Sequence, residues 1–301
     1  MEVDKEVAVA RVKMYISDLK KLIQYTDLYE NATEQLLRET KDMVYGPEYP
    51  ETSLFENVMA ENTKALDVLL TMGVVAIRWA DTAHYNAVVD SLSAVANRRI
   101  STPTQGYQNT FKLNHMLDTA YLYGLGIACV IYKKYTLLDQ LLRIKFYEQG
   151  RRFSSYIIDE DNCWIIDSNT WNNTGYSRLK TPFSTNLFNR LRSYFTMIRD
   201  DKEYFSYACI FEKLLSMYYY LLISKDSNLD LWPPIGAFCW QPLYLERSQN
   251  ATYKEFFEAI DREKENGQVL QSGMFEGSYA VYKEVFDGVT DIEKKVRLEL
   301  Y

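Results

Sequence analysis

Two apolar segments with the same internal order most restrict how this chain can fold. Each of "GVVAIRWADTAHYNAVVDSL" (73–92) and "GIACVIYKKYTLLDQLL" (126–142) has a Gly on an apolar run, an aromatic residue, a short break, a Tyr and a second apolar run. Because Gly inside a helix costs about 1 kcal/mol relative to Ala, Gly73 and Gly126 are expected where helices approach closely. The pattern predicts two helical hairpins packed in tandem, as in helical-repeat proteins.

Helical spacing of apolar residues continues through most of the chain. Val3, Val7, Ala10 and Met14 recur at helical spacing at the start. The stripe continues with Leu19, Leu22 and Ile23, and a second helical pattern runs from about 31 to 43. Only 12 Gly and 7 Pro occur in 301 residues, which favours long helices over turn-rich β architecture. We therefore predict an all-α fold of packed helical hairpins, arranged as an irregular repeat or a bundle.

Two capping patterns near the end of the chain predict where its last helices begin. Thr252 with Glu255 forms one Thr-x-x-Glu capping box, and Thr290 with Glu293 forms another. The second box predicts a short, separate terminal helix.

The segment 154–182 departs from helical spacing. Two β-favouring runs, Tyr156–Ile158 and Cys163–Ile166, flank an acidic turn, which predicts a small β-hairpin or a long loop. We expect a helical region over 1–153 with two hairpin-like units, this insertion, and a helical region over 183–301. One continuous domain is the alternative.

Composition argues against several classes of protein. The net charge is −7, which opposes a nucleic-acid-binding role. The four Cys lie far apart with no nearby His, so neither a metal site nor a disulfide framework is expected, and a reducing, cytoplasmic location fits. The longest apolar runs, 121–132 and 214–223, are too short to cross a bilayer. The 25 Tyr suit half-buried helix faces and interfaces.

Catalytic signatures are absent from the sequence. It has no phosphate-binding loop, no G-x-S-x-G and no H-E-x-x-H, and no cofactor motif is recognised. The acidic cluster at 159–161 with Asp167 reads as a solvated turn rather than a cation loop. Whether the protein is an enzyme is left open, with the negative answer favoured. A pocket lined by His84, His115 and Tyr85 is the alternative, because such groups meet in space and not in sequence.

The stretch "LWPPIGAFCWQP" (231–242) is the densest aromatic and Pro-rich segment. Its prolines fix an extended path and Gly236 permits a bend. Trp232, Phe238 and Trp240 alternate, so two or three large rings can face one side. Such a segment is either a partner surface or a plug that anchors a loop over a helical core. We favour the plug, because an exposed patch this apolar is an aggregation hazard. The residues of a partner surface would be Trp232, Pro233, Pro234, Phe238 and Trp240, with Trp164 and Trp171 of the insertion.

The run "WPPIGAFCW" (232–240) resembles a P-x-G-x-F-x-W pattern in helical regions of bacterial defence-type proteins. Those regions follow sirtuin-like, Toll/interleukin-receptor-like or P-loop effector domains, and segments 66–79 and 121–142 are similar to their helices. Ala237 stands where the pattern has Arg. The resemblance implies a sensor or regulatory module, either part of a longer effector protein or a stand-alone relative.

Two functional hypotheses follow. The first is a non-enzymatic helical interaction module that binds a protein partner or self-associates, without cofactor, metal or membrane. The second is a helical protein with a small-molecule or catalytic pocket lined by Tyr and His.

Overall fold

The computed structural model describes residues 4–43, 52–98, 115–146, 155–160, 181–224, 236–239 and 252–299. In its first half, helices are separated by short breaks. The elements are α1 (Lys5–Ile16), η1 (Leu19–Lys21), α2 (Leu22–Glu39), α3 (Thr52–Ala65), α4 (Asp67–Trp79), η2 (Thr82–His84), α5 (Tyr85–Ala96), α7 (Met116–Ile131) and α8 (Tyr135–Leu142). Side chains cap the starts of α1, η1 and η2. The Asp4, Asp18 and Asp81 carboxylates each accept hydrogen bonds from N–H groups two or three residues later.

Helices form over both predicted hairpin segments, as α4 and α5 and as α7 and α8, and α7 packs on α8. Helix α4 packs on α7, and α5 packs on α8. A Cβ on Gly73 would overlap the side chain of Leu125 in α7, and a Cβ on Gly126 would overlap the ring of Phe211. Both glycines therefore lie at close helix approaches, which confirms the prediction made for them.

The insertion begins differently from its prediction. Strand β1 (Lys145–Phe146) pairs antiparallel with β2 (Ser155–Tyr156), so the partner of Tyr156 is Lys145, which precedes it in the chain. Ile157 and Ile158, predicted as strand, belong instead to the helical turn α9 (Ile157–Glu160), because both side chains are buried where this turn packs against the core. The predicted strand at 163–166 lies outside the described residues.

The second half is again helical. Its elements are α11 (Pro182–Leu191), η4 (Arg192–Phe195), α12 (Asp201–Tyr219), the π-helical turn η5 (Tyr220–Ser224), η6 (Ala237–Cys239), α14 (Thr252–Glu263), η7 (Lys264–Asn266), α15 (Gln268–Gln271), η8 (Met274–Gly277) and α16 (Tyr279–Glu299). The separate terminal helix is a wrong prediction, since α16 runs through Thr290 without a break. Thr290 and Glu293 contact Lys213 of α12 instead of capping a helix.

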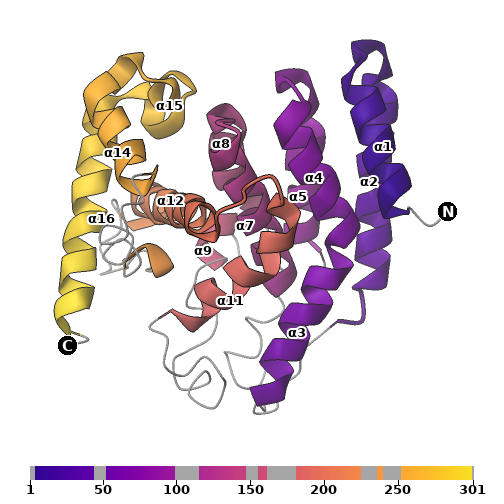
Figure 1. The fold of residues 1–301 in the computed structure, drawn as a ribbon, viewed down its shortest axis with the longest axis horizontal. Helices are drawn as coiled ribbons and strands as arrows, with labels where there is room; N and C mark the ends of the chain where they lie inside the picture. Colours follow the sequence, from indigo (N-terminus) through magenta and orange to yellow (C-terminus); the bar gives the residue numbers. More distant parts are fainter. Residues whose placement is uncertain are drawn as a thin grey trace.

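The helices follow one another along the long axis, from α1 and α2 near the N-terminus to α16 near the C-terminus, so the termini lie at opposite ends (Figure 1). Buried side chains form one continuous core that extends from Ala8 to Val296. Helix α12 is central, because it packs against α7, α14, α16 and η6. The all-α class is confirmed, and the described parts of both halves share this core. Within the described ranges, none of the helices combines the length and apolar character needed to cross a membrane.

The first apolar stripe has an unexpected orientation. Val7, Met14, Leu19 and Ile23 are exposed, whereas α1 buries Ala8 and Val12 against its neighbours. Leu19 and Ile23 belong to η1 and α2 rather than to the first helix. Helical spacing thus predicted helices here but not which face is buried. The buried face carries the small residue Ala8, which allows α1 to pack close to the helices beside it.

Candidate functional site

The described part of the Trp/Pro stretch, Gly236–Cys239, is enclosed by the protein and held at its start by Glu212. Ala237, Phe238 and Cys239 have no exposed surface. The fully buried carboxylate of Glu212 accepts hydrogen bonds from the Ser184 hydroxyl at 2.6 Å, the Tyr123 hydroxyl at 3.3 Å and the Phe238 N–H at 3.2 Å. The donors come from α11, α7 and η6, so Glu212 joins three separate elements to α12.

The chemistry of Glu212 is unusual for a carboxyl group. Burial raises its pKa to about 7, and the hydrogen bonds from Ser184, Phe238, Tyr123 and Ala237 oppose that rise. No ion pair with a described residue compensates its charge. Gly236 lies directly against the carboxyl group.

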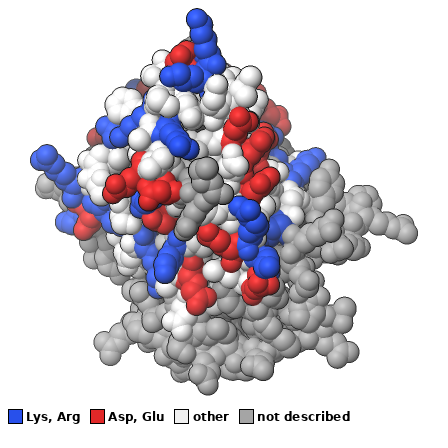
Figure 2. Space-filling model, turned by 90° about the vertical axis from the view of Figure 1, so that its right-hand side faces the viewer, with Lys and Arg blue, Asp and Glu red and all other residues white. Residues whose placement is uncertain are grey.

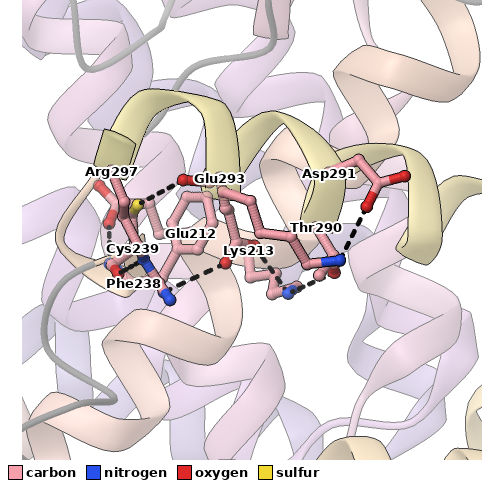
Figure 3. Close-up of polar contacts among 9 residues, drawn as sticks. Glu212, Lys213, Phe238, Cys239, Thr290, Asp291, Glu293 and Arg297 are labelled. Atoms are coloured by element: carbon pink, nitrogen blue, oxygen red, sulfur yellow. Dashed lines mark hydrogen bonds and ion pairs between the residues drawn. The ribbon is translucent and has the colours of Figure 1, made fainter. Parts of the chain in front are cut away.

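A second set of polar side chains, Lys213, Glu293 and Arg297, lies at the Cys239 end of η6. Lys213, adjacent to Glu212, donates to Glu293 Oε1 at 2.7 Å and Thr290 Oγ1 at 3.4 Å (Figure 3). Arg297 lies 3.4 Å from Glu293 Oε2, and its Nε donates to the Cys239 carbonyl at 2.8 Å. Glu293 therefore lies between two cations in an almost buried triad, and α12 and α16 hold η6 from both ends. We call Glu212, Lys213, Glu293 and Arg297 the central polar cluster.

Phe238 is thus a core residue, as the plug interpretation expects, and it is not available to a partner. The other proposed surface residues lie outside the described ranges: Trp232, Pro233, Pro234, Trp240, Trp164 and Trp171. Whether those six form a partner surface stays a prediction.

The histidines proposed for an alternative pocket do not come together through any described contact. His84 is buried, its Nδ1 lies 2.7 Å from Asp81 Oδ1, and its ring meets the Tyr25 ring edge-on. His115 lies 3.2 Å from Asp118, at the start of α7. Each histidine therefore interacts with the carboxylate three residues away at its own helix start, which is a local structural arrangement.

Tyr85 and the potential metal ligands give no further support to that pocket. Tyr85 is buried, and this burial raises its pKa. Among the described residues, no three His, Cys, Asp or Glu side chains gather to hold a metal ion.

A groove of about 720 Å³ lies between α1, α4 and the turn after α11. Helices α1 and α4 run in the same direction beside it, with Lys5 bound to Asp67 at 2.6 Å near one end and Ile16 beside Trp79 at the other. The Arg78 guanidinium lies 4.7 Å from the Trp79 ring centroid, and Trp79 is 58% exposed. We call this the α1–α4 groove.

The described residues that line the α1–α4 groove include cations and no acidic side chain. Lys5, Lys13 and Arg78 line it. Lys13 and Arg78 also occupy the last turns of α1 and α4, where a cation stabilises the helix dipole. Neither forms an ion pair with a described residue, and the Arg78 guanidinium lies over the rings of Trp79 and Tyr132.

Exposed apolar side chains gather on this side of the molecule. Of seven exposed large hydrophobic residues with described side chains, six lie on or beside α1, η1, α2, α4 and η4: Val7, Met14, Leu19, Ile23, Trp79 and Met197. The seventh, Leu298, lies on α16 at the other end. Figure 2 shows the face that carries α1 and α2, where Lys and Arg are mixed with Asp and Glu around uncharged surface.

Comparison with protein-family models, curated proteins and solved structures gave no match for this chain.

Sequence reasoning missed both the central polar cluster and the α1–α4 groove. A signal for the cluster existed, because Glu212 and Lys213 interrupt the apolar run "FEKLLSMYYYLLIS", where buried charges need partners. The groove had only a weak signal, since the sequence does not distinguish an exposed Trp79 at a helix end from an aromatic residue packed in the core. Its walls come from α1, α4 and η4, whose proximity is a product of folding.

Proposed function

We propose that this protein is a non-enzymatic helical interaction module and that it binds a protein partner through the α1–α4 groove. The observation that carries the proposal is a groove whose lining includes the exposed side chains of Trp79 and Met197 beside Lys13 and Arg78. Trp and Arg are the residues that most often dominate binding energy at protein interfaces, and here Trp79 and Arg78 stack together at the groove.

The partner is a segment that carries a carboxylate next to an apolar side chain. Lys13 and Arg78 supply two cations without a described ion pair, which complement the carboxylate. Val74, Ile16 and Met197 supply the apolar lining beside Trp79. The resemblance to helical regions of bacterial defence-type proteins adds a biological setting, in which this module regulates an effector carried by another domain or chain.

The experiment compares tagged wild-type protein with Trp79→Ala and Leu298→Ala variants expressed in the source cells. Each substitution removes an exposed apolar side chain from a helix end, so both variants should fold. Co-purified proteins are quantified by mass spectrometry, and binding of the partner found is then measured with purified components. We expect Trp79→Ala to weaken binding about tenfold or more, and Leu298→Ala to leave it unchanged.

Native mass spectrometry of the same preparations separates the alternatives. A defined hetero-complex that Trp79→Ala dissociates supports the proposal. A homo-oligomer that Trp79→Ala dissociates would assign the face to self-association instead. Equal partner recovery with both variants would show that the α1–α4 groove is not the binding surface.

A further inference from the structure

A second groove, of about 550 Å³, lies between α14 and the corner that joins α7 to α8. Its floor is apolar and aromatic. Tyr135 at the start of α8 and Phe256 of α14 lie with ring centroids 6.1 Å apart, and Ile210 of α12 also lines the groove. A floor of this kind binds an apolar group of side-chain size. We call this the α8–α14 groove.

The rim of the α8–α14 groove carries charges of both signs, and most of them already have partners. Glu263 lies 3.5 Å from Arg262, and Glu258 lies 3.6 Å from Lys254. The Lys264 ammonium is 5.5 Å from the centroid of the Tyr279 ring.

Two rim charges are left without an ion pair to a described residue. They are Lys133, in the α7–α8 corner, and Glu255, on α14. The groove therefore offers one cation and one anion, carried by different walls.

The position of Lys133 is fixed by the backbone. Lys133 has φ of 57°, in the left-handed region that a residue with a Cβ seldom occupies. Its carbonyl accepts a hydrogen bond at 3.3 Å from Gln268 of α15, which ties this corner to the chain that follows α14 and η7. The two walls of the groove are thus joined at one end.

We propose that the α8–α14 groove binds a small zwitterion with an apolar body, of the class of apolar α-amino acids and dipeptides. The Lys133 ammonium receives the ligand carboxylate, the Glu255 carboxylate receives the ligand ammonium, and Tyr135 and Phe256 receive the apolar side chain. Unlike the pocket suggested by sequence, this site uses Tyr but neither His84 nor His115. It is separate from the α1–α4 groove, and neither proposal depends on the other.

The experiment uses four probes that differ by one charge or by length: leucine, leucyl-leucine, N-acetylleucine and leucinamide. Binding to the full chain is measured by calorimetry. We expect leucine or leucyl-leucine to bind. N-acetylleucine and leucinamide each lack one charge, so each should bind at least about threefold more weakly than leucine, which is the affinity that one exposed ion pair typically contributes.

Two variants assign each ligand charge to its wall. Glu255→Gln should remove the preference for leucine over N-acetylleucine, and Lys133→Gln should remove the preference for leucine over leucinamide. Glu30→Gln, an exposed change on α2, is the matched control and should leave all affinities unchanged. Equal binding of all probes, preferences that persist in both variants, or no binding at millimolar concentration would overturn the proposal.

Discussion

Gly236 lies so close to Glu212 that a methyl group on Gly236 would overlap the Glu212 carboxyl group. We predict that Gly236→Ala destabilises the protein by about 1–3 kcal/mol, the usual cost of adding an atom to a packed interior. Urea denaturation measures this loss. In the double variant Gly236→Ala with Glu212→Ala the overlap is gone, so the total loss should be smaller than the sum of the single losses. Strictly additive losses would contradict the contact.

Stability should depend on pH through Glu212. Its pKa in the folded protein is about 7, above the ordinary value of 4.5. The folded state therefore binds the proton more tightly, and this contribution is fully present below pH 4.5 and is lost as pH rises through 7. The pKa difference corresponds to about 3 kcal/mol. Glu212→Gln cannot titrate, so the stability of wild type relative to this variant should fall by that order between these pH values. If the unfolding free energies of wild type and Glu212→Gln differ by the same amount at every pH between 4.5 and 7, the raised pKa of Glu212 is refuted.

The central polar cluster should be far more sensitive than surface ion pairs on the same helix. Lys213→Met removes the more buried of the two cations beside Glu293 and leaves Arg297 as its partner, so we expect a loss of about 2 kcal/mol or more. Lys294→Met breaks the exposed pair with Asp291, which has a separation of 2.9 Å, and should cost less than about 1 kcal/mol. Thermal or urea unfolding of the two variants compares them directly. Similar losses would mean that the Lys213–Glu293 pair is not buried in solution.

The two hairpin glycines should differ in their tolerance of Ala. Gly126→Ala would press on the Phe211 ring, which is buried and packed edge-on against Tyr123, so we expect a loss of about 2 kcal/mol or more. Gly73→Ala meets the end of the Leu125 side chain, which can rotate, and the gain in helix propensity of about 1 kcal/mol offsets the contact. Unfolding free energies that rank the two variants in the opposite order would contradict this account.

The sequence predicted the helices and their tandem order because those features depend on local spacing. It also located Gly73 and Gly126, since an unfavourable residue inside a helix needs a packing reason. It failed where distant elements decide the outcome. Thr290 and Glu293 have the pattern of a helix start, but Lys213 of α12 engages both, and α16 continues past them.

The candidate surfaces were predictable to a smaller extent. The sequence left two roles open for Phe238, a plug in the core or a contact with a partner. Its complete burial in the folded chain shows that it belongs to the core. The stripe from Val7 to Ile23 was visible as apolar, but its exposure depends on how α1 seats on α4. Lys133 and Glu255 are 122 positions apart by their numbers, and no local pattern relates them.

The attachment of Cys239 to Arg297 links two parts of the chain in their local unfolding. The Phe238 N–H is protected only while Glu212 and η6 stay together, and η6 in turn is held by a side chain close to the end of α16. Opening of the last turns of α16 would free the Cys239 carbonyl and admit water to the Phe238 N–H. Amide protons of η6 and of the end of α16 should therefore exchange with solvent as one cooperative unit, because α16 holds η6 in place.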